Sequence, residues 1–203
     1  MRLFIMPFIF VWGFGIAFLG SMVGVFWADQ GLSISEYGIL SATATGAGGL
    51  LAALSVPWLV ERIGLAKTTM ISMAFIPVQA IMYMSFSELG IPAWSLLLPT
   101  YVFIAWVVSF FGYAAAISRF RWVSKAQAGT DYAVQSSIAN LGTSSGASLS
   151  GFAVAFLGWT NFFPLAAVVG MIGGIYYVAM FEHIEKMVTT RERTEMDIEL
   201  ADK

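Results

Sequence analysis

Six long stretches of apolar residues divide this sequence, and each is about as long as a helix that crosses a lipid bilayer. The hydrocarbon core of a bilayer is about 30 Å thick, so a crossing helix needs roughly 20 apolar residues. We predict membrane-spanning helices at residues 3–28, 37–60, 68–86, 92–117, 132–157 and 162–181. A water-soluble fold of this length cannot hide that much apolar surface. The predicted fold class is therefore an all-α membrane protein, a bundle of six transmembrane helices.

The composition agrees with a lipid environment and excludes several kinds of site. The sequence is 59% hydrophobic and only 11% charged, whereas soluble proteins carry about 25% charged residues. It contains no cysteine, and its single histidine, His183, follows the last apolar run. The net charge is −2, and no basic stretch resembles a nucleic-acid footprint. We expect no cofactor, no metal site and no nucleic-acid partner.

The charged residues fix the expected topology. With six crossings, one side of the membrane holds the whole set of basic residues, which are Arg2, Arg62, Lys67, Arg119, Arg121, Lys125, Lys186, Arg191, Arg193 and Lys203. The loops on the other side carry only Asp29, Glu36 and Glu88. Cytoplasmic loops are enriched in Lys and Arg. We therefore predict a transmembrane domain over residues 1–181, both termini in the cytoplasm, and a charged cytoplasmic tail over residues 182–203 that is helical at its start and then frayed.

The fifth apolar run combines a polar face with a face of small residues. Helical spacing places Ser137, Asn140, Ser144 and Ser148 on one face. Hydrocarbon offers such side chains no partner, so they must face protein or water, and both interhelical hydrogen bonding and a solvated solute pathway remain open.

Small residues at four-residue steps predict close helix packing. Such steps occur at Gly142, Gly146 and Ser150 in the fifth run, and at Gly20 and Gly24 in the first. The alternative is that glycine-rich helices bend or slide in a moving transporter.

Four aromatic residues with polar tips lie deep inside predicted helices, namely Trp12, Tyr101, Trp106 and Tyr113. A buried Trp or Tyr needs a partner for its polar tip. Plain packing is the simpler interpretation of all four, and contact with a solute is the alternative. The sequence has no HExxH, P-loop or GxGxxG pattern and no GxSxG nucleophile elbow, so we predict that the protein is not an enzyme.

The loop after the second predicted helix reads Pro57-Trp-Leu-Val-Glu61-Arg62-Ile-Gly64-Leu-Ala-Lys67. This stretch resembles the loop signature of the major facilitator superfamily. That signature is a glycine, three residues, Asp-Arg, one residue, glycine and then basic residues. Here Pro57 replaces the first glycine and Glu61 replaces the Asp, while Arg62, Gly64 and Lys67 follow the pattern. The resemblance implies that Glu61 and Arg62 belong to a loop that biases a conformational switch. A solvated turn that obeys the charge rule is the simpler alternative.

A second stretch, Ala128-Gly-Thr-Asp131-Tyr-Ala-Val-Gln135, opens the fifth predicted helix. It resembles the junction of the tenth and eleventh helices in permeases that import muropeptides or siderophores. Thr130 or Asp131 is suited to cap this helix by accepting free backbone N–H groups. Proton or substrate coupling is the alternative role for Asp131.

Together the resemblances imply the C-terminal six-helix half of a secondary active transporter. Such a carrier moves a small organic solute, siderophore-like or muropeptide-like, across a bacterial inner membrane by alternating access. The expected partners are the lipid bilayer, the solute, and an N-terminal six-helix half, in the same gene or a separate chain, or a second copy. The helices that line the cavity in this family imply a candidate solute pathway of Trp12, Tyr101, Trp106, Gln135 and Asn140.

A different class of function also fits the sequence. The chain is alternatively a non-transporting membrane scaffold, or a truncated remnant of a carrier, that associates through its glycine-rich helix faces.

Overall fold

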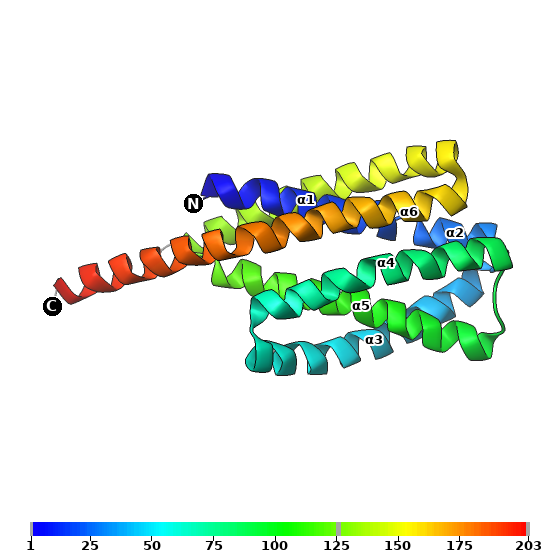
Figure 1. The fold of residues 1–203 in the computed structure, drawn as a ribbon, viewed down its shortest axis with the longest axis horizontal. Helices are drawn as coiled ribbons and strands as arrows, with labels where there is room; N and C mark the ends of the chain where they lie inside the picture. Colours follow the sequence, from blue (N-terminus) through cyan, green and yellow to red (C-terminus); the bar gives the residue numbers. More distant parts are fainter. Residues whose placement is uncertain (1, 125–126, 202–203) are drawn as a thin grey trace.

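All elements of the protein are helices in the computed structural model, which describes residues 2–124 and 127–201 (Figure 1). The described part of the chain contains no strand. The helices are α1 (Arg2–Gly20), α2 (Val23–Asp29), α3 (Ile34–Ile63), α4 (Leu65–Leu89), α5 (Trp94–Arg121) and α6 (Ala128–Ala201).

The long helix α6 consists of two helices that meet at Gly158. This residue has φ 68° and ψ 170°, a conformation that glycine adopts without a steric penalty. Figure 1 shows α6 turning back on itself and running toward the end of the molecule that holds both termini. We call residues 128–157 the outgoing arm of α6 and residues 159–201 its returning arm.

Five helical segments in the described residues are long and apolar enough to cross a membrane. The first, Ile5–Asp29, joins α1 and α2, and the last, Ala128–Thr194, contains both arms of α6. The expected frayed tail is not observed, because the returning arm stays helical to Ala201.

The first predicted helix, residues 3–28, is interrupted in the structure. α1 ends at Gly20, and α2 begins again at Val23. Of the predicted packing pair in this region, Gly20 is wrong, because an added Cβ there would meet nothing within 4 Å. Gly24 does lie at a helix contact, where it faces the ring of Tyr37 on α3 at 3.4 Å. The uniform hydropathy of the run conceals this break.

Helix ends follow from local chemistry. Ser33 and Glu36 form a reciprocal capping box at the start of α3, so Glu36 lies in the first turn of that helix rather than in a loop. Gly64 and Gly90 have φ values of 85° and 80° and end α3 and α4. α5 also ends later than predicted, because it continues to Arg121 instead of ending near residue 117.

Close backbone contacts define two seams in the bundle. In the first seam, α1 packs on the outgoing arm, where Gly142 and Gly146 face the backbone of Phe10 and Phe14. In the second seam, α3 packs on α5, and Gly48 faces the backbone of Trp106. The small-residue face that the sequence predicted in the fifth run is thus a packing face.

The returning arm joins α1 to α4, since Gly170 lies against Ile76 and Gly173 against Val11. The main core contains the large buried side chains Phe26, Trp27, Tyr83, Phe162 and Phe163. The returning arm, α1 and α4, together with α5, line the cavity described below.

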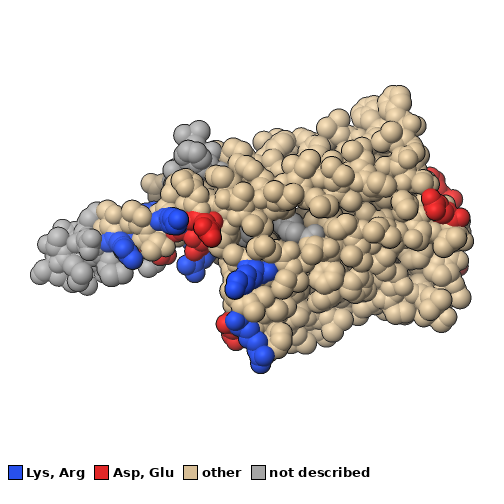
Figure 2. Space-filling view, in the orientation of Figure 1, with Lys and Arg blue, Asp and Glu red and all other residues tan. Residues whose placement is uncertain are grey.

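Charges separate along the bundle (Figure 2). The basic residues with described side chains lie at the end that holds both termini, and they are Arg62, Lys67, Arg119, Arg121, Lys186, Arg191 and Arg193. The opposite end carries Asp29, Glu36 and Glu88. Lys125, Lys203 and the side chain of Arg2 lie outside the described residues. Which end faces the cytoplasm stays a prediction.

Candidate functional site

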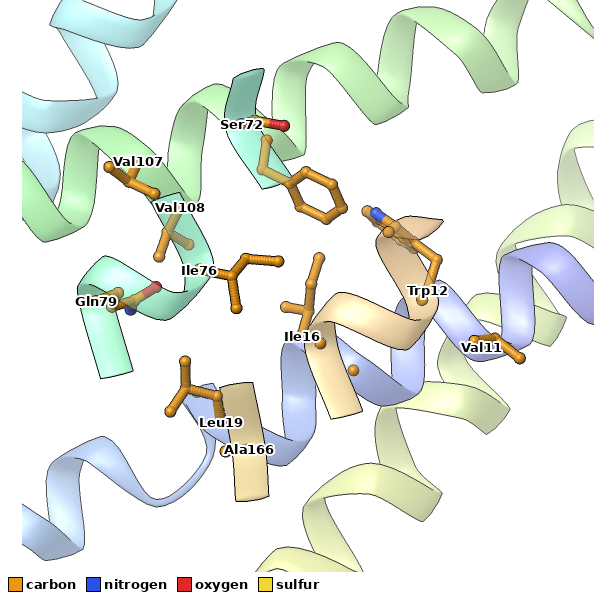
Figure 3. A pocket seen from close by; sticks show the side chains of 16 residues that line it. Val11, Trp12, Ile16, Leu19, Ser72, Ile76, Gln79, Val107, Val108 and Ala166 are labelled. Atoms are coloured by element: carbon orange, nitrogen blue, oxygen red, sulfur yellow. The ribbon is translucent and has the colours of Figure 1, made fainter. Parts of the chain in front are cut away.

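A cavity of about 90 Å³ lies inside the bundle between α1, α4, α5 and the returning arm (Figure 3). Its wall is mostly aliphatic and glycine-rich, and its polar contributions come from Trp12, Ser72 and Gln79. Gln79 is buried, with 6% of its surface exposed. This volume accepts a few water molecules or a small group of a larger molecule.

Trp12 projects toward this cavity with an unsatisfied polar tip. Its indole nitrogen is buried and has no hydrogen-bond partner. Figure 3 shows that nitrogen on the side of the ring turned toward the middle of the cavity. The ring packs near Phe111 at a centroid distance of 5.9 Å. A buried donor without an acceptor is costly, which makes Trp12 a candidate contact for an acceptor group.

Arg119 lies over the face of the Trp12 ring. Its guanidinium carbon is 4.9 Å from the ring centroid, a cation–π distance. Its Nε is also buried without a partner. Arg119 lies beyond residue 117, where the fourth apolar run was predicted to end, but the structure includes it in α5. Helical spacing could have indicated its place in α5, because Arg119 follows Phe111 by about two turns on the same face.

Tyr101 lies in a different place, in the aromatic core near α2. It is 7% exposed, and its ring meets the edge of Trp27 at 5.8 Å. Its hydroxyl is close enough to those of Tyr37 and Tyr83 to interact with them. The indole nitrogen of Trp27 is buried without a hydrogen bond.

Trp106 belongs to the second seam. Its Nε1 donates a hydrogen bond to Ser55 Oγ at 3.1 Å, and its ring contacts Phe75, Phe103 and Phe110. Its polar tip therefore already has a partner within the bundle. These contacts match the packing interpretation of this residue.

Gln135 lines a second hollow of about 210 Å³ at the basic end. It is 7% exposed, and its Oε1 has no hydrogen-bond partner. Asp131 lines the same hollow, and its carboxylate accepts a hydrogen bond from the backbone N–H of Ser124 at 3.0 Å. Because α6 begins at Ala128, Asp131 lies within the first turn and not before it. Its charge is favourable near a helix N-terminus, and it also ties the preceding loop to α6.

Asn140 lies on the outside of the bundle, with Ser137, Ser144 and Ser148. This polar face points away from the first seam. The Ser137 and Ser148 hydroxyls bond to carbonyls of their own helix at 2.9 Å and 2.8 Å. The Asn140 amide makes no hydrogen bond within the part of the chain that the structure describes.

The two residues of the signature loop lie at the end of α3. Glu61 and Arg62 are both exposed. The Arg62 guanidinium stacks over the ring of Trp58, with 4.3 Å between its carbon and the ring centroid. The predicted pathway residues thus occupy separate places, and the structure adds Arg119 beside Trp12.

Comparison with known proteins assigns the family. The sequence model of the Major Facilitator Superfamily matches residues 3–199. The chain belongs to the major facilitator superfamily. No curated protein and no solved structure gave a significant match.

Major facilitator proteins are membrane transporters and not enzymes, so this chain is a multi-pass membrane protein of a transporter family. The predicted superfamily is confirmed, and the relation to one group of permeases within it stays a prediction. In a major facilitator protein the site of interest is a solute pathway, and the exposed polar face and the Trp12–Arg119 pair are its candidates.

Proposed function

We propose that this chain is the C-terminal six-helix half of a secondary active transporter. In this proposal the two arms of α6 are the fifth and sixth membrane crossings, and both termini are cytoplasmic. The carrier moves a small organic solute, siderophore-like or muropeptide-like, across a bacterial inner membrane by alternating access. The proposal rests above all on the polar face of the outgoing arm.

The Asn140 amide on that face cannot be satisfied by lipid, whereas the Ser137 and Ser148 hydroxyls already bond to their own helix. The Asn140 side chain is exposed on a helix within a membrane-spanning segment, beside Ser137 and Ser144. Hydrocarbon supplies no hydrogen bonds, so such residues face protein or a water-filled pathway. A second six-helix unit would supply both a protein surface and a water-filled pathway beside this face. We infer that an N-terminal half, in the same gene or a separate chain, or a second copy covers this face.

The arrangement of the two seams supports the same proposal. Carrier halves of this kind contain two three-helix repeats of inverted topology, which relate the first helix to the fourth and the second to the fifth. The first seam joins the first and fifth crossings, and the second seam joins the second and fourth. The repeat relation therefore converts the pair of first and fifth crossings into the pair of fourth and second crossings, so each seam is the repeat counterpart of the other.

The Trp12–Arg119 pair supports a solute that presents acceptors. Both unpartnered groups of the pair are hydrogen-bond donors, and one is cationic. Carboxylates and carbonyl oxygens are their natural partners. Siderophore-like and muropeptide-like solutes are rich in such oxygens. Glu61, Arg62 and Asp131 are then the candidates for the conformational switch and for coupling.

Solvent access at the polar face tests the proposal. The chain has no cysteine, so single Cys replacements of Ser137, Asn140 and Ser144 can be labelled selectively in the complete carrier. We expect reaction with a water-soluble thiol reagent at these positions. Ile81→Cys, on the exposed surface of α4, is the control and should stay unlabelled.

Uptake measurements complete the test. Asn140→Ala and Gln135→Ala should lower solute uptake without lowering membrane abundance. Silent cysteines at all three positions, together with normal uptake in both alanine variants, would leave the non-transporting scaffold as the better description.

A further inference from the structure

A basic groove lies outside the bundle, between the start of α4 and the returning arm of α6. It consists of two adjoining hollows of about 350 and 480 Å³ that share Ala66, Phe181 and Glu185. Figure 2 shows basic side chains gathered where the projecting end of α6 leaves the body of the bundle. The cations that line the groove are Lys67, Arg121, Lys186 and Arg193.

The groove has an excess of positive charge. Its two carboxylates belong to Glu182 and Glu185. Glu185 is already engaged, because Arg121 Nε donates to it at 2.9 Å and Trp122 Nε1 at 3.1 Å. Within the described part of the chain, Lys67 and Lys186 form no ion pair. Two positive charges therefore remain in excess, and at least two ammonium groups are free to meet an anion.

The N-terminus of α4 opens into the same groove. Gly64, Leu65 and Ala66 line it, and no side chain caps this helix end. The first N–H groups of a helix have no partner within the helix, and they carry partial positive charge. This end of α4 adds backbone donors to the four cationic side chains, a combination suited to a phosphate.

The groove also lies at the border of the apolar surface. On α4, Met70 and Ile71 follow Lys67 by one turn and are 48% and 38% exposed. On the returning arm, the face that carries Lys186 continues at helical spacing to the exposed residues Ile175 and Ile172. On each of these two helices, the exposed face that lines the groove is cationic at the groove and apolar farther along the helix.

We propose that this groove binds the headgroup of an anionic phospholipid, with the acyl chains along the exposed faces of α4 and the returning arm. Basic pockets at helix ends recognise lipid phosphates in this way. A soluble anion would satisfy the cations but would make no use of the adjoining apolar faces. The site is separate from the Trp12–Arg119 pair and does not depend on the transported solute.

Native mass spectrometry of the purified full chain in detergent tests the proposal, with phosphatidylglycerol and phosphatidylcholine as probes. We expect one tightly held phosphatidylglycerol and weaker binding of phosphatidylcholine. Removing one cation should weaken phosphatidylglycerol binding about fivefold, which corresponds to ~1 kcal/mol. The double variant Lys67→Gln/Lys186→Gln should show the product of two such losses. Arg193→Gln, on the projecting helix, provides a variant that leaves the bundle intact.

Arg62→Gln is the matched control, because Arg62 lies at the same end but does not line the groove. Its phosphatidylglycerol binding should equal that of the unchanged chain. Equal losses in the control and the groove variants would overturn the proposal, since charge alone would then explain binding. Unchanged binding in Arg193→Gln and in a folded double variant would also overturn it. Displacement of the lipid by millimolar inorganic phosphate would assign the groove to a soluble anion instead.

Discussion

The two seams of the bundle join helices in a similar way but with different chemistry. Between α1 and the outgoing arm, Gly13, Gly142 and Gly146 bring backbone against backbone. Between α3 and α5, one glycine, Gly48, makes the close approach. There the seam also holds an indole–hydroxyl hydrogen bond from Trp106 to Ser55. In lipid, burial gives helices no reason to associate. The first seam therefore depends mainly on close backbone contact at three glycines, and the second combines one such contact with a side-chain hydrogen bond.

Adding methyl groups to the first seam should have the largest effect. In Gly142→Ala/Gly146→Ala, each new Cβ would overlap a backbone carbonyl oxygen, of Phe10 and Phe14 respectively. Backbone cannot rotate away, so each site should cost at least the upper part of the ~1–3 kcal/mol typical of overpacking. We expect loss of monodisperse protein in size-exclusion chromatography. Gly151→Ala, on the same arm with open space around it, should behave like the unchanged chain.

The single glycine of the second seam should be the next most sensitive. A Cβ at Gly48 would lie 2.5 Å from Trp106 N and 2.7 Å from the Ala105 carbonyl carbon. Gly48→Ala should therefore destabilise by ~1–3 kcal/mol, seen as a lower melting temperature in detergent. Gly46→Ala is the control, since a Cβ there meets nothing within 4 Å. Equal melting temperatures for Gly48→Ala and Gly46→Ala would mean that the close approach of α3 and α5 does not contribute to stability.

Removing the hydrogen bond of the second seam should have a smaller effect. Ser55→Ala deletes the acceptor of Trp106 Nε1 and leaves its N–H unpaired. We expect a loss of ~1 kcal/mol in a denaturant titration. Combining it with Trp106→Phe should cost less than the sum of the two single changes, because the phenyl ring has no donor to leave unpaired. Strict additivity would show that the bond carries no stability.

The smallest effect is expected at a pair of hydroxyl groups at the end of the first seam, directly after α1. Ser21 Oγ and Ser150 Oγ are 2.8 Å apart, and Ser150 Oγ also donates to the Ala147 carbonyl oxygen at 2.7 Å. Interhelical hydrogen bonds in membrane proteins average ~0.6 kcal/mol. Ser150→Ala should therefore shift the melting temperature less than Ser55→Ala does. A larger shift would make side chains, and not contact distance, the basis of both seams.

The sequence predicted the apolar helices well because hydropathy is a property of whole segments. Their ends depend on single residues. The capping box of Ser33 and Glu36 extends α3 beyond the predicted start. The break after Gly20 has no hydropathy signal, and the charged residues after Phe181 continue the same helix to Ala201.

The candidate site was predicted less completely, because pairing between distant residues is invisible to helical spacing. The polar face around Asn140 follows from spacing alone. The stacking of Arg119 on Trp12 does not, because it joins residues more than one hundred positions apart. The charge of Arg119 indicated a loop, whereas its surroundings make it part of α5.

The returning arm has a mechanical consequence. It leaves the bundle and continues as one unbroken helix to Ala201 (Figure 1). The arm stays packed on the bundle through Val188 and Arg191, whose guanidinium donates to the Val123 carbonyl oxygen. The part that projects, from Arg191 to Ala201 at 1.5 Å per residue, is a helix about 15 Å long. A tilt of the last crossing by about 10° would move the far end of this projecting helix by roughly 3 Å. The projecting helix is thus a lever arm, and a distance label near its tip would amplify rearrangements that are too small to see inside the membrane.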